Sequence, residues 1–512
     1  MKKDYIFLLG LAFIRLVLPF LLQHGDYQLH RDSYLYLDYA NHMDWGYMEV
    51  PPLLSVFSLL ALTLGNSFFW VQFWPALFGA LTFLLCGDIV LRQDGGRYAL
   101  LLLLISLVFG AFIRTFFLFQ PGFLEIFFWT AISWSLIRYE QSKHTQWLYA
   151  FGIACGLGML SKYTTAFFLC GLLGGLILTC KKNVITQKHF YLAGLIGFCM
   201  FLPNLWWQYT HNFPVVHHMK ELRETQLVYM DTSGFVMGQI MMNFVVAYIW
   251  IAGLFGLVFA KSLKAFRWIG ISFFITLGLL MTGSGKDYYA LGLYPILFAF
   301  GALQIERFFK KKYLFFKVAI IVITAAFGSY ILPLGLPTFS PEKLANYYEK
   351  AGFRKALGFK WEDQKNHPLP QDFADMIGWH ETAAMAAKNY KQLPDSVKKE
   401  TIIFCRGYYS AGALNYYGKK MGLPTAYSDN GSYLLWLPTN FSFKHLMLIG
   451  HSNPDRDDIV FNHFKKRMVM DSLSLPYFRE DGIKIFFFEN GSDSMRYYAN
   501  HGTRMERSKF SR

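Results

Sequence analysis

Up to Pro333 the chain alternates between long apolar stretches and short polar connections. Most stretches approach the roughly 17–25 residues that a helix needs to cross the hydrocarbon core of a bilayer. The pattern predicts about eleven membrane-spanning helices, at residues 5–23, 68–91, 98–113, 123–137, 147–160, 163–180, 190–207, 235–259, 268–282, 288–303 and 314–332. The predicted fold class is a polytopic α-helical membrane protein.

Clusters of basic residues recur on every second connection between these stretches. Because basic residues stay on the cytoplasmic side of a membrane, they predict a cytoplasmic N-terminus in an inner (plasma) membrane. The connections at 24–67 and 208–234 and everything after Pro333 are then extracytoplasmic. The first stretch lacks a small-residue cleavage site, so we expect a retained span rather than a signal peptide. The basic clusters include Lys2 and Lys3, Arg92 and Arg97, Arg138 and Lys143, and Lys181, Lys182 and Lys188.

The composition changes after Pro333, where apolar runs become short and charges frequent. This change divides the chain into a transmembrane domain at 1–333, with the outer loop 24–67, and a soluble extracytoplasmic domain at 334–512. Short apolar runs predict strands at 401–405, 445–450 and 484–488, and helical spacing predicts helices at 379–390 and 411–417. The second domain is expected to be mixed α/β. Residues 406–412 turn from strand to helix but lack the Lys and Ser/Thr of a phosphate-binding P-loop.

The composition argues against a nucleic-acid-binding protein, a disulfide framework and a thiolate zinc site. Hydrophobic residues make up 54% of the chain and the formal net charge is +15. Part of that charge is the topology signal, and no duplex-binding motif accompanies it, so we expect no nucleic-acid partner. The 6 cysteines lie mostly in apolar stretches and show no CxxC spacing, which argues against a disulfide framework and a thiolate zinc site.

The outer loop carries the first candidate chemistry. Asp32 precedes residues 33–43, whose apolar positions share one helical face and predict an amphipathic helix along the membrane surface. Asp32 is either the N-cap of that helix or a catalytic base. Asp38 and Asp44 fall on other faces and are expected to be solvated. Glu49 follows in a stiff turn that ends at Pro51-Pro52.

These residues resemble the first outer loop of membrane glycosyltransferases of the GT-C class. The similarity is closest to bacterial protein O-mannosyltransferase-like and aminoarabinose-transferase-like members, and rests on Arg31-Asp32 with Trp45-Gly46-Tyr47 and Pro51-Pro52. Further matching segments follow in the same order over most of the chain. They are Gln120-Pro121 with Glu125, Lys162-Tyr163, residues 204–208 and 212–214, Lys286-Asp287-Tyr288-Tyr289, residues 373–379 and residues 411–418.

The resemblance implies transfer of a hexosyl or pentosyl group from a polyprenyl-phosphate donor, with inversion, on the outer face of the membrane. The acceptor would be a lipid, a cell-envelope glycan or a protein. Asp32 matches the catalytic aspartate of the family. A carboxylate with a pKa of about 4 is ionised at neutral pH and can take the proton of an acceptor hydroxyl. The leaving phosphate departs as an anion, so the reaction needs no second carboxylic acid.

The departing phosphate requires positive charge. Lys286, at the outer end of a span, is the first candidate, although a lysine there also snorkels without any role in binding. Lys162, Arg31 and Arg114 follow in that order. Glu125 matches a second acidic position of the family, and a charge favoured by the helix dipole is the alternative.

Glu49 and His218 resemble positions that bind a metal ion in the aminoarabinose transferases. Two ligands are too few for a zinc site, and His211 and His217 are candidates to complete it. No cofactor is therefore certain, and a divalent metal ion stays open.

Two other functions compete with sugar transfer. A polytopic transporter or flippase of a lipid-linked substrate would share the spans, but its ionisable residues tend to lie near the bilayer midplane and its halves to repeat. A noncatalytic GT-C relative would bind glycan or peptide. Many relatives have glutamate where this chain has Ser33, and this difference is the one feature that favours a noncatalytic protein.

Overall fold

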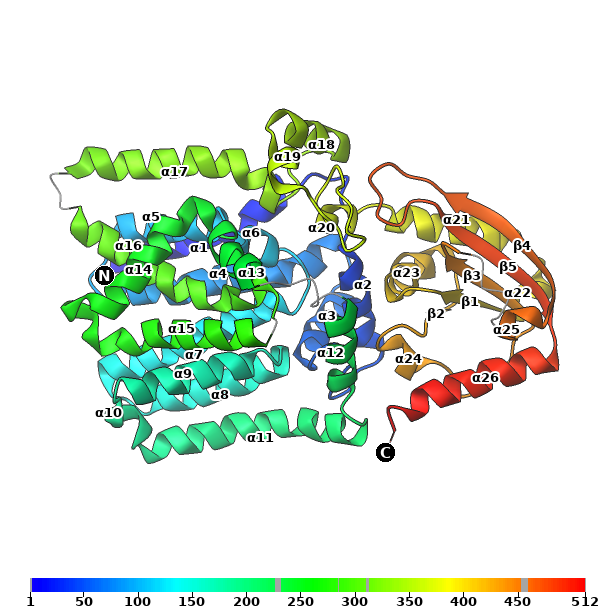
Figure 1. Cartoon of the computed structure of the whole chain (residues 1–512), viewed down its shortest axis with the longest axis horizontal. Helices are drawn as coiled ribbons and strands as arrows, with labels where there is room; N and C mark the ends of the chain where they lie inside the picture. Colours follow the sequence, from blue (N-terminus) through cyan, green and yellow to red (C-terminus); the bar gives the residue numbers. More distant parts are fainter. Residues whose placement is uncertain (1, 226–231, 284, 310–312, 453–458, 512) are drawn as a thin grey trace.

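The computed structural model describes residues 2–225, 232–283, 285–309, 313–452 and 459–511. Part of the predicted outer connection 208–234 therefore lies outside the described residues. Two parts make up the molecule: a bundle of long helices at one end, and a sheet with its own helices at the other (Figure 1).

Each predicted span contains a helix. The bundle consists of α1 (Lys2–Leu22), α4 (Phe68–Arg92), α5 (Arg97–Val108), α6 (Phe112–Thr115), α7 (Gly122–Ser142), α8 (Gln146–Ser161), α9 (Thr165–Leu178), α10 (Lys182–Ile185), α11 (Lys188–Thr210), α13 (Thr232–Met241), α14 (Ala247–Phe259), α15 (Arg267–Thr282), α16 (Tyr294–Phe308) and α17 (Leu314–Gly335). Short 3-10 helices at Phe244–Val246, Lys261–Phe266 and Asp287–Leu293 lead into α14, α15 and α16.

Among the described residues, 6 helices are long and apolar enough to cross a membrane. They are α1, α4, α11, α15 and α16 with their leading 3-10 turns, and α17. The pair Thr232–Met241 and Phe244–Phe259, bent by 65°, adds a seventh if it counts as one span. The polytopic helical class is confirmed, whereas the number eleven stays a prediction because helices such as α5 and α9 are shorter than a full crossing.

Small residues set the closest helix contacts in the bundle. A side chain on Gly301 of α16 would clash with the backbone of Ile249 in α14, and one on Gly253 would clash with the backbone of Leu297. In lipid, where no hydrophobic force drives helices together, such close backbone approach supplies the packing energy.

The second part contains one sheet in the order β2-β1-β3-β5-β4. Strands β1 (Thr401–Cys405), β2 (Ala426–Tyr427) and β3 (His445–Gly450) run parallel, while β5 (Ile483–Gly491) is antiparallel to both β3 and β4 (Phe464–Leu473). The three predicted strands are confirmed within β1, β3 and β5. Sequence analysis missed β4 because it is an edge strand with a run of charged residues, which interrupts the apolar signal.

Helices surround this sheet and connect it to the bundle. They are α18 (Pro341–Lys350), α19 (Phe353–Leu357), α20 (Gln371–Ala374), α21 (Trp379–Lys391), α22 (Asp395–Lys398), α23 (Tyr408–Ala413), α24 (Tyr433–Trp436), α25 (Ile459–Asn462) and α26 (Asp493–Ser508). The predicted helix 379–390 is α21. The other predicted helix begins three residues earlier than expected, as α23, and continues as a π-helical turn over Leu414–Gly418.

The first outer loop lies between the two parts of the molecule. Figure 1 shows α2 (Arg31–Asp38), α3 (Leu53–Thr63) and α12 (Pro214–Thr225) between the bundle and the sheet. The expected helix over 33–43 ends at Asp38 and continues as a 3-10 turn, Tyr39–Asn41. Leu35 and Tyr39 are buried against other parts of the protein, so the prediction that this face lies along the membrane surface is wrong.

Gly412 of α23 packs closely against Tyr34 of α2. A Cβ at this position would lie 2.8 Å from the carbonyl carbon and the Cβ of Tyr34. We expect Gly412→Ala to push α23 away from α2 and to lower the free energy of unfolding by about 1–3 kcal/mol. Thermal unfolding in detergent would measure the change.

Gly502→Ala is the matched control, because Gly502 lies in α26 with open space around its Cα. This variant is expected to be neutral or more stable by up to about 1 kcal/mol. Equal melting temperatures for the two variants would contradict the tight contact at Gly412.

Candidate active site

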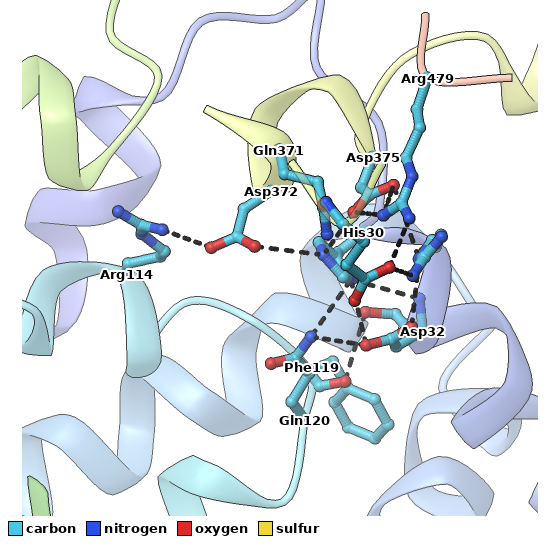
Figure 2. A network of polar contacts seen from close by, with 12 residues as sticks. His30, Asp32, Arg114, Phe119, Gln120, Gln371, Asp372, Asp375 and Arg479 are labelled. Atoms are coloured by element: carbon cyan, nitrogen blue, oxygen red, sulfur yellow. Dashed lines mark hydrogen bonds and ion pairs between the residues drawn. The ribbon is translucent and has the colours of Figure 1, made fainter. Parts of the chain in front are cut away.

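Asp32 lies at the start of α2 with its carboxylate held by two donors. The Tyr408 hydroxyl donates to Oδ1 at 2.6 Å. The Gln120 amide donates to Oδ2 at 3.2 Å (Figure 2). The N-cap of α2 is His30, whose Nδ1 accepts from the Asp32 backbone N–H at 3.2 Å. Asp32 is therefore not the N-cap. Its side chain is 27% exposed, so another molecule can reach the carboxylate.

The surroundings keep Asp32 ionised. Burial favours the neutral acid, but the charges of His30 and Arg31 and the hydrogen bond from Tyr408 outweigh burial, so the pKa of Asp32 is lowered from its usual value of 3.8. A charge-assisted hydrogen bond stabilises the ionised form. The carboxylate is consequently available as a base over the whole neutral pH range.

Arg31 connects Asp32 to the second part of the molecule. Its Nε lies 3.6 Å from Asp32 Oδ1 and 3.5 Å from Asp375 Oδ1, and its Nη2 lies 3.4 Å from Glu362 Oε2. Arg479 donates to Asp375 Oδ2 at 2.9 Å (Figure 2). It also donates to Glu362 Oε2 at 2.6 Å, so it shares these two carboxylates with Arg31. The guanidinium of Arg31, a predicted phosphate ligand, is thus already surrounded by carboxylates.

His30, Asp372 and Asp375 form the one group of three metal-ligand side chains found within the described ranges. The His30 Nδ1 accepts from the Asp32 N–H, so in the neutral ring Nε2 carries the proton and faces Asp375 at 3.6 Å and Asp372 at 4.0 Å. Arg114 pairs with Asp372, and Arg479 pairs with Asp375. Because guanidinium groups already balance both carboxylates, this group does not fit a divalent ion.

Asp375 is only 1% exposed. Burial raises its pKa to about 6, against the opposing effect of Arg31, His30 and Arg479. Asp372 behaves in the opposite way: burial raises its pKa, but the charges of Arg114 and His30 outweigh burial and leave it lowered.

Two of the predicted lysines approach the same region from the bundle. Lys286, at the N-terminus of the Asp287–Leu293 turn, is in electrostatic range of Glu362, Asp32 and Asp372. Lys162 donates to Glu125 at 2.8 Å, and its ammonium lies 4.4 Å from the centre of the Tyr289 ring. Glu125, the second predicted acid, is therefore the ion-pair partner of Lys162.

Arg114, the last predicted phosphate ligand, connects the end of α17 to α20. Besides Asp372, it donates to the carbonyls of Leu334 at 2.8 Å and Gly335 at 3.4 Å, at the end of α17. These contacts join the last bundle helix to α20.

The predicted metal ligands Glu49 and His218 do not belong to any group of three ligand side chains in the described part of the chain. Glu49 instead accepts hydrogen bonds from the Tyr39 hydroxyl at 2.8 Å, the Ser432 N–H at 2.8 Å and the Ser432 hydroxyl at 2.5 Å. His211 stacks on Trp207, and His217 packs edge-on against Phe510.

Asp38 also differs from expectation. It is 6% exposed rather than solvated. It accepts hydrogen bonds from Asn41, Asn415 and Tyr433, each at 2.7 Å. The second part of the molecule covers this face of α2, which the sequence period of α2 alone does not reveal.

Sequence analysis missed Tyr408, which donates to Asp32, and Asp375, which pairs with Arg31. Tyr408 lies in the strand-to-helix turn that was considered as a phosphate loop, and Asp375 lies in a segment that matched the GT-C pattern without an assigned role. Both segments are named in the sequence analysis, one as a strand-to-helix turn and one as a GT-C-like motif, but neither indicated a place in this site. Because Tyr408 and Asp375 lie several hundred residues from Asp32 in the chain, the sequence alone does not show that they are close to it.

Part of the sequence is similar to known glycosyltransferases. Residues 49–207 match the family model of dolichyl-phosphate-mannose-protein mannosyltransferases. The lipid A galacturonosyltransferase RgtD of Rhizobium johnstonii is 22% identical over 205 residues, which are 37% of this chain and 41% of that protein. The match thus spans less than half the length of this curated relative.

Solved structures extend the comparison to nearly the whole chain. ArnT from Cupriavidus metallidurans, bound to undecaprenyl phosphate, matches over 96% of this chain and 98% of that chain, with a TM-score of 0.64 and 12% identity. The chain resembles the GT-C membrane glycosyltransferases. Arabinofuranosyltransferase AftD from Mycobacteria shares the GT-C fold over 95% of this chain and 40% of that chain, with a TM-score of 0.53 and 11% identity.

The comparisons confirm the resemblance and the GT-C fold that the motifs predicted. The family match includes Glu49, Glu125 and Lys162 but begins after Asp32 and ends before Lys286. The assignment of Asp32 therefore depends on the geometry of the site.

Loss of Arg479 should destabilise this site, because it removes two ion pairs. Arg479→Ala leaves the buried Asp375 with Arg31 and His30 but without its hydrogen-bonded guanidinium, and we expect a loss of about 3 kcal/mol in the free energy of unfolding, as for other broken buried ion pairs. Chemical unfolding at pH 7.5 would measure this loss of stability.

The control is Arg496→Ala, which removes an exposed ion pair with Asp493 and should change the free energy of unfolding by less than about 1 kcal/mol. A similar small effect at Arg479 would refute the structural importance of the pair.

Proposed function

We propose that the chain is a GT-C glycosyltransferase of the cytoplasmic membrane. It moves one hexosyl or pentosyl group from a polyprenyl-phosphate donor to a lipid, cell-envelope glycan or protein on the outer face, and inverts the anomeric carbon. In this proposal the N-terminus is cytoplasmic and the sheet-containing part, residues 334–512, is extracytoplasmic. The observation that carries the proposal is Asp32, an ionised and accessible carboxylate at the junction of the two parts.

The chemistry requires one base. The acceptor oxygen attacks the anomeric carbon and transfers its proton to Asp32, while the bond from that carbon to the phosphate oxygen breaks. The electron pair of the broken bond leaves with the polyprenyl phosphate, and Asp32 later releases its proton to water. Because the leaving group is already an anion of low basicity, no acid has to protonate it.

The two lysines would act on the donor. Lys286 and Lys162 belong to the bundle, the part that a lipid-linked phosphate would reach from the membrane. Their ammonium groups can stabilise the negative charge that develops on the departing phosphate. The ArnT structure with undecaprenyl phosphate supports the donor class, since this chain shares that fold along nearly its whole length. Arg31 and Arg114 follow the lysines in the order predicted from the sequence, and Lys162, Arg31 and Arg114 each already pair with a carboxylate.

Asp32→Asn tests the assignment of the base. Asparagine keeps the size of the side chain but cannot take the proton, so we expect transfer to fall by about 10²–10⁴-fold while the protein stays folded. The assay is release and transfer of sugar from a panel of synthetic polyprenyl-phosphate sugars in lipid, with cell-envelope extract as acceptor. The control Asp26→Asn removes an exposed carboxylate of the same loop, 3.4 Å from His24, and should transfer at the wild-type rate. Near wild-type transfer by Asp32→Asn would falsify the role of Asp32.

Lys286→Ala tests the donor site. Loss of one cation near the departing phosphate should lower kcat/KM for the donor by about a hundredfold, and the KM for the acceptor should not change. Lys343→Ala, which removes an exposed lysine from α18, is the control for loss of positive charge. Unchanged donor kinetics in Lys286→Ala would remove this lysine from the mechanism.

A further inference from the structure

We propose that Tyr408 is a positioning residue for Asp32: its hydroxyl holds Oδ1 of the carboxylate and leaves Oδ2 to receive the acceptor proton. The inference rests on the proposed function and deepens it. It also gives the sheet-containing part a direct role in the reaction, because Tyr408 follows strand β1 and begins helix α23.

The local fold explains why Tyr408 reaches Asp32. Tyr408 and Gly412 are four residues apart in α23, so they lie on the same face of the helix. Gly412 packs against the backbone of Tyr34 in α2, which leaves no room for a side chain between the two helices. This close approach brings the Tyr408 hydroxyl to 2.6 Å from Asp32 Oδ1.

The two oxygens of Asp32 have different environments. Oδ1 has the Tyr408 hydroxyl at 2.6 Å and the Arg31 Nε at 3.6 Å. Oδ2 has the neutral Gln120 amide at 3.2 Å and the His30 Nδ1 at 3.8 Å, and that nitrogen accepts a hydrogen bond from the Asp32 N–H. Arg31 and His30 lie at similar distances from the two oxygens, so the difference comes from the hydrogen bonds, and the short bond from a hydroxyl lowers the basicity of an oxygen more than the longer bond from an amide does. Oδ2 is therefore the more basic oxygen.

Tyr408 keeps its donor role at all working pH values. Burial, together with the neighbouring Asp32 charge, raises the pKa of the Tyr408 hydroxyl well above its usual value of 10.0. The hydroxyl therefore stays protonated and does not compete with Asp32 as a base. The same bond helps to keep Asp32 ionised, because it favours the charged carboxylate.

Other charged or titratable groups also face Asp32, and the test must keep them in place. They come from α2, from the bundle and from the sheet-containing part, and are His30, Arg31, Tyr36, Lys286, Tyr288, Asp372 and Asp375. Since Tyr408→Phe leaves all of them unchanged, its effect on the pH profile reports the single lost hydrogen bond.

The experiment compares the pH profile of kcat for sugar transfer in the wild type, Tyr408→Phe and Tyr416→Phe. Tyr416→Phe is the matched control, since it removes another hydroxyl that bridges from the second part to the first, donating to the Asn66 carbonyl at 2.7 Å. For Tyr408→Phe we expect kcat to fall about 10- to 100-fold, as for loss of one hydrogen bond to a charged group. Its acidic limb should move to higher pH, and the donor KM should not change. Tyr416→Phe should keep the wild-type acidic limb.

The outcomes separate the two proposals. If the wild type and Tyr416→Phe transfer no sugar, the proposed function is wrong. If they transfer sugar and Tyr408→Phe has the same kcat and acidic limb, the function stands and the inference about Tyr408 is overturned. If Tyr408→Phe does not fold, 3-fluorotyrosine at position 408 replaces it. This more acidic phenol should move the acidic limb to lower pH, and an unmoved limb overturns the inference.

Discussion

The carboxylate of Asp32 is the group on which the arrangement of the site depends. A partly buried carboxylate stays charged only when donors and cations compensate for the lost water. Here the compensating groups come from three parts of the chain: the Arg31 cation beside it in α2, the Gln120 donor in the connection before α7, and the Tyr408 donor in α23. Each region must dock correctly before the base is complete.

The junction between the bundle and the sheet-containing part is accordingly polar and charged. Asp375, Glu362 and Arg479 from the second part surround Arg31, and Asp372 pairs with Arg114 from the bundle. Such paired charges add little net stability, but they penalise any arrangement that leaves one partner unpaired. The network therefore fixes the orientation of the two parts more than it increases the overall free energy of unfolding.

In the proposed reaction, the two sides of this junction have different roles. Lys162 and Lys286 belong to the bundle, where a membrane-held carrier would present its phosphate. Tyr408, Asp372 and Asp375 belong to the sheet-containing part, the side from which an acceptor would arrive in this proposal. Asp32 lies between them, and its 27% exposure leaves room for the acceptor oxygen. In the proposed reaction the lipid-linked donor and the acceptor meet at this carboxylate.

The sequence by itself determined the features that depend on short-range patterns. Apolar period and length predicted the bundle helices and the strands β1, β3 and β5, and ordered motifs indicated the GT-C resemblance, Asp32 and the two lysines. Edge strand β4 escaped because its charged residues break the apolar pattern. Tertiary structure alone decided which groups hold Asp32, because Gln120 and Tyr408 are 88 and 376 residues away from it in the chain. It also buried Asp38 and engaged Glu49 with Ser432, since contacts between distant segments follow from how whole helices pack and not from local residue patterns.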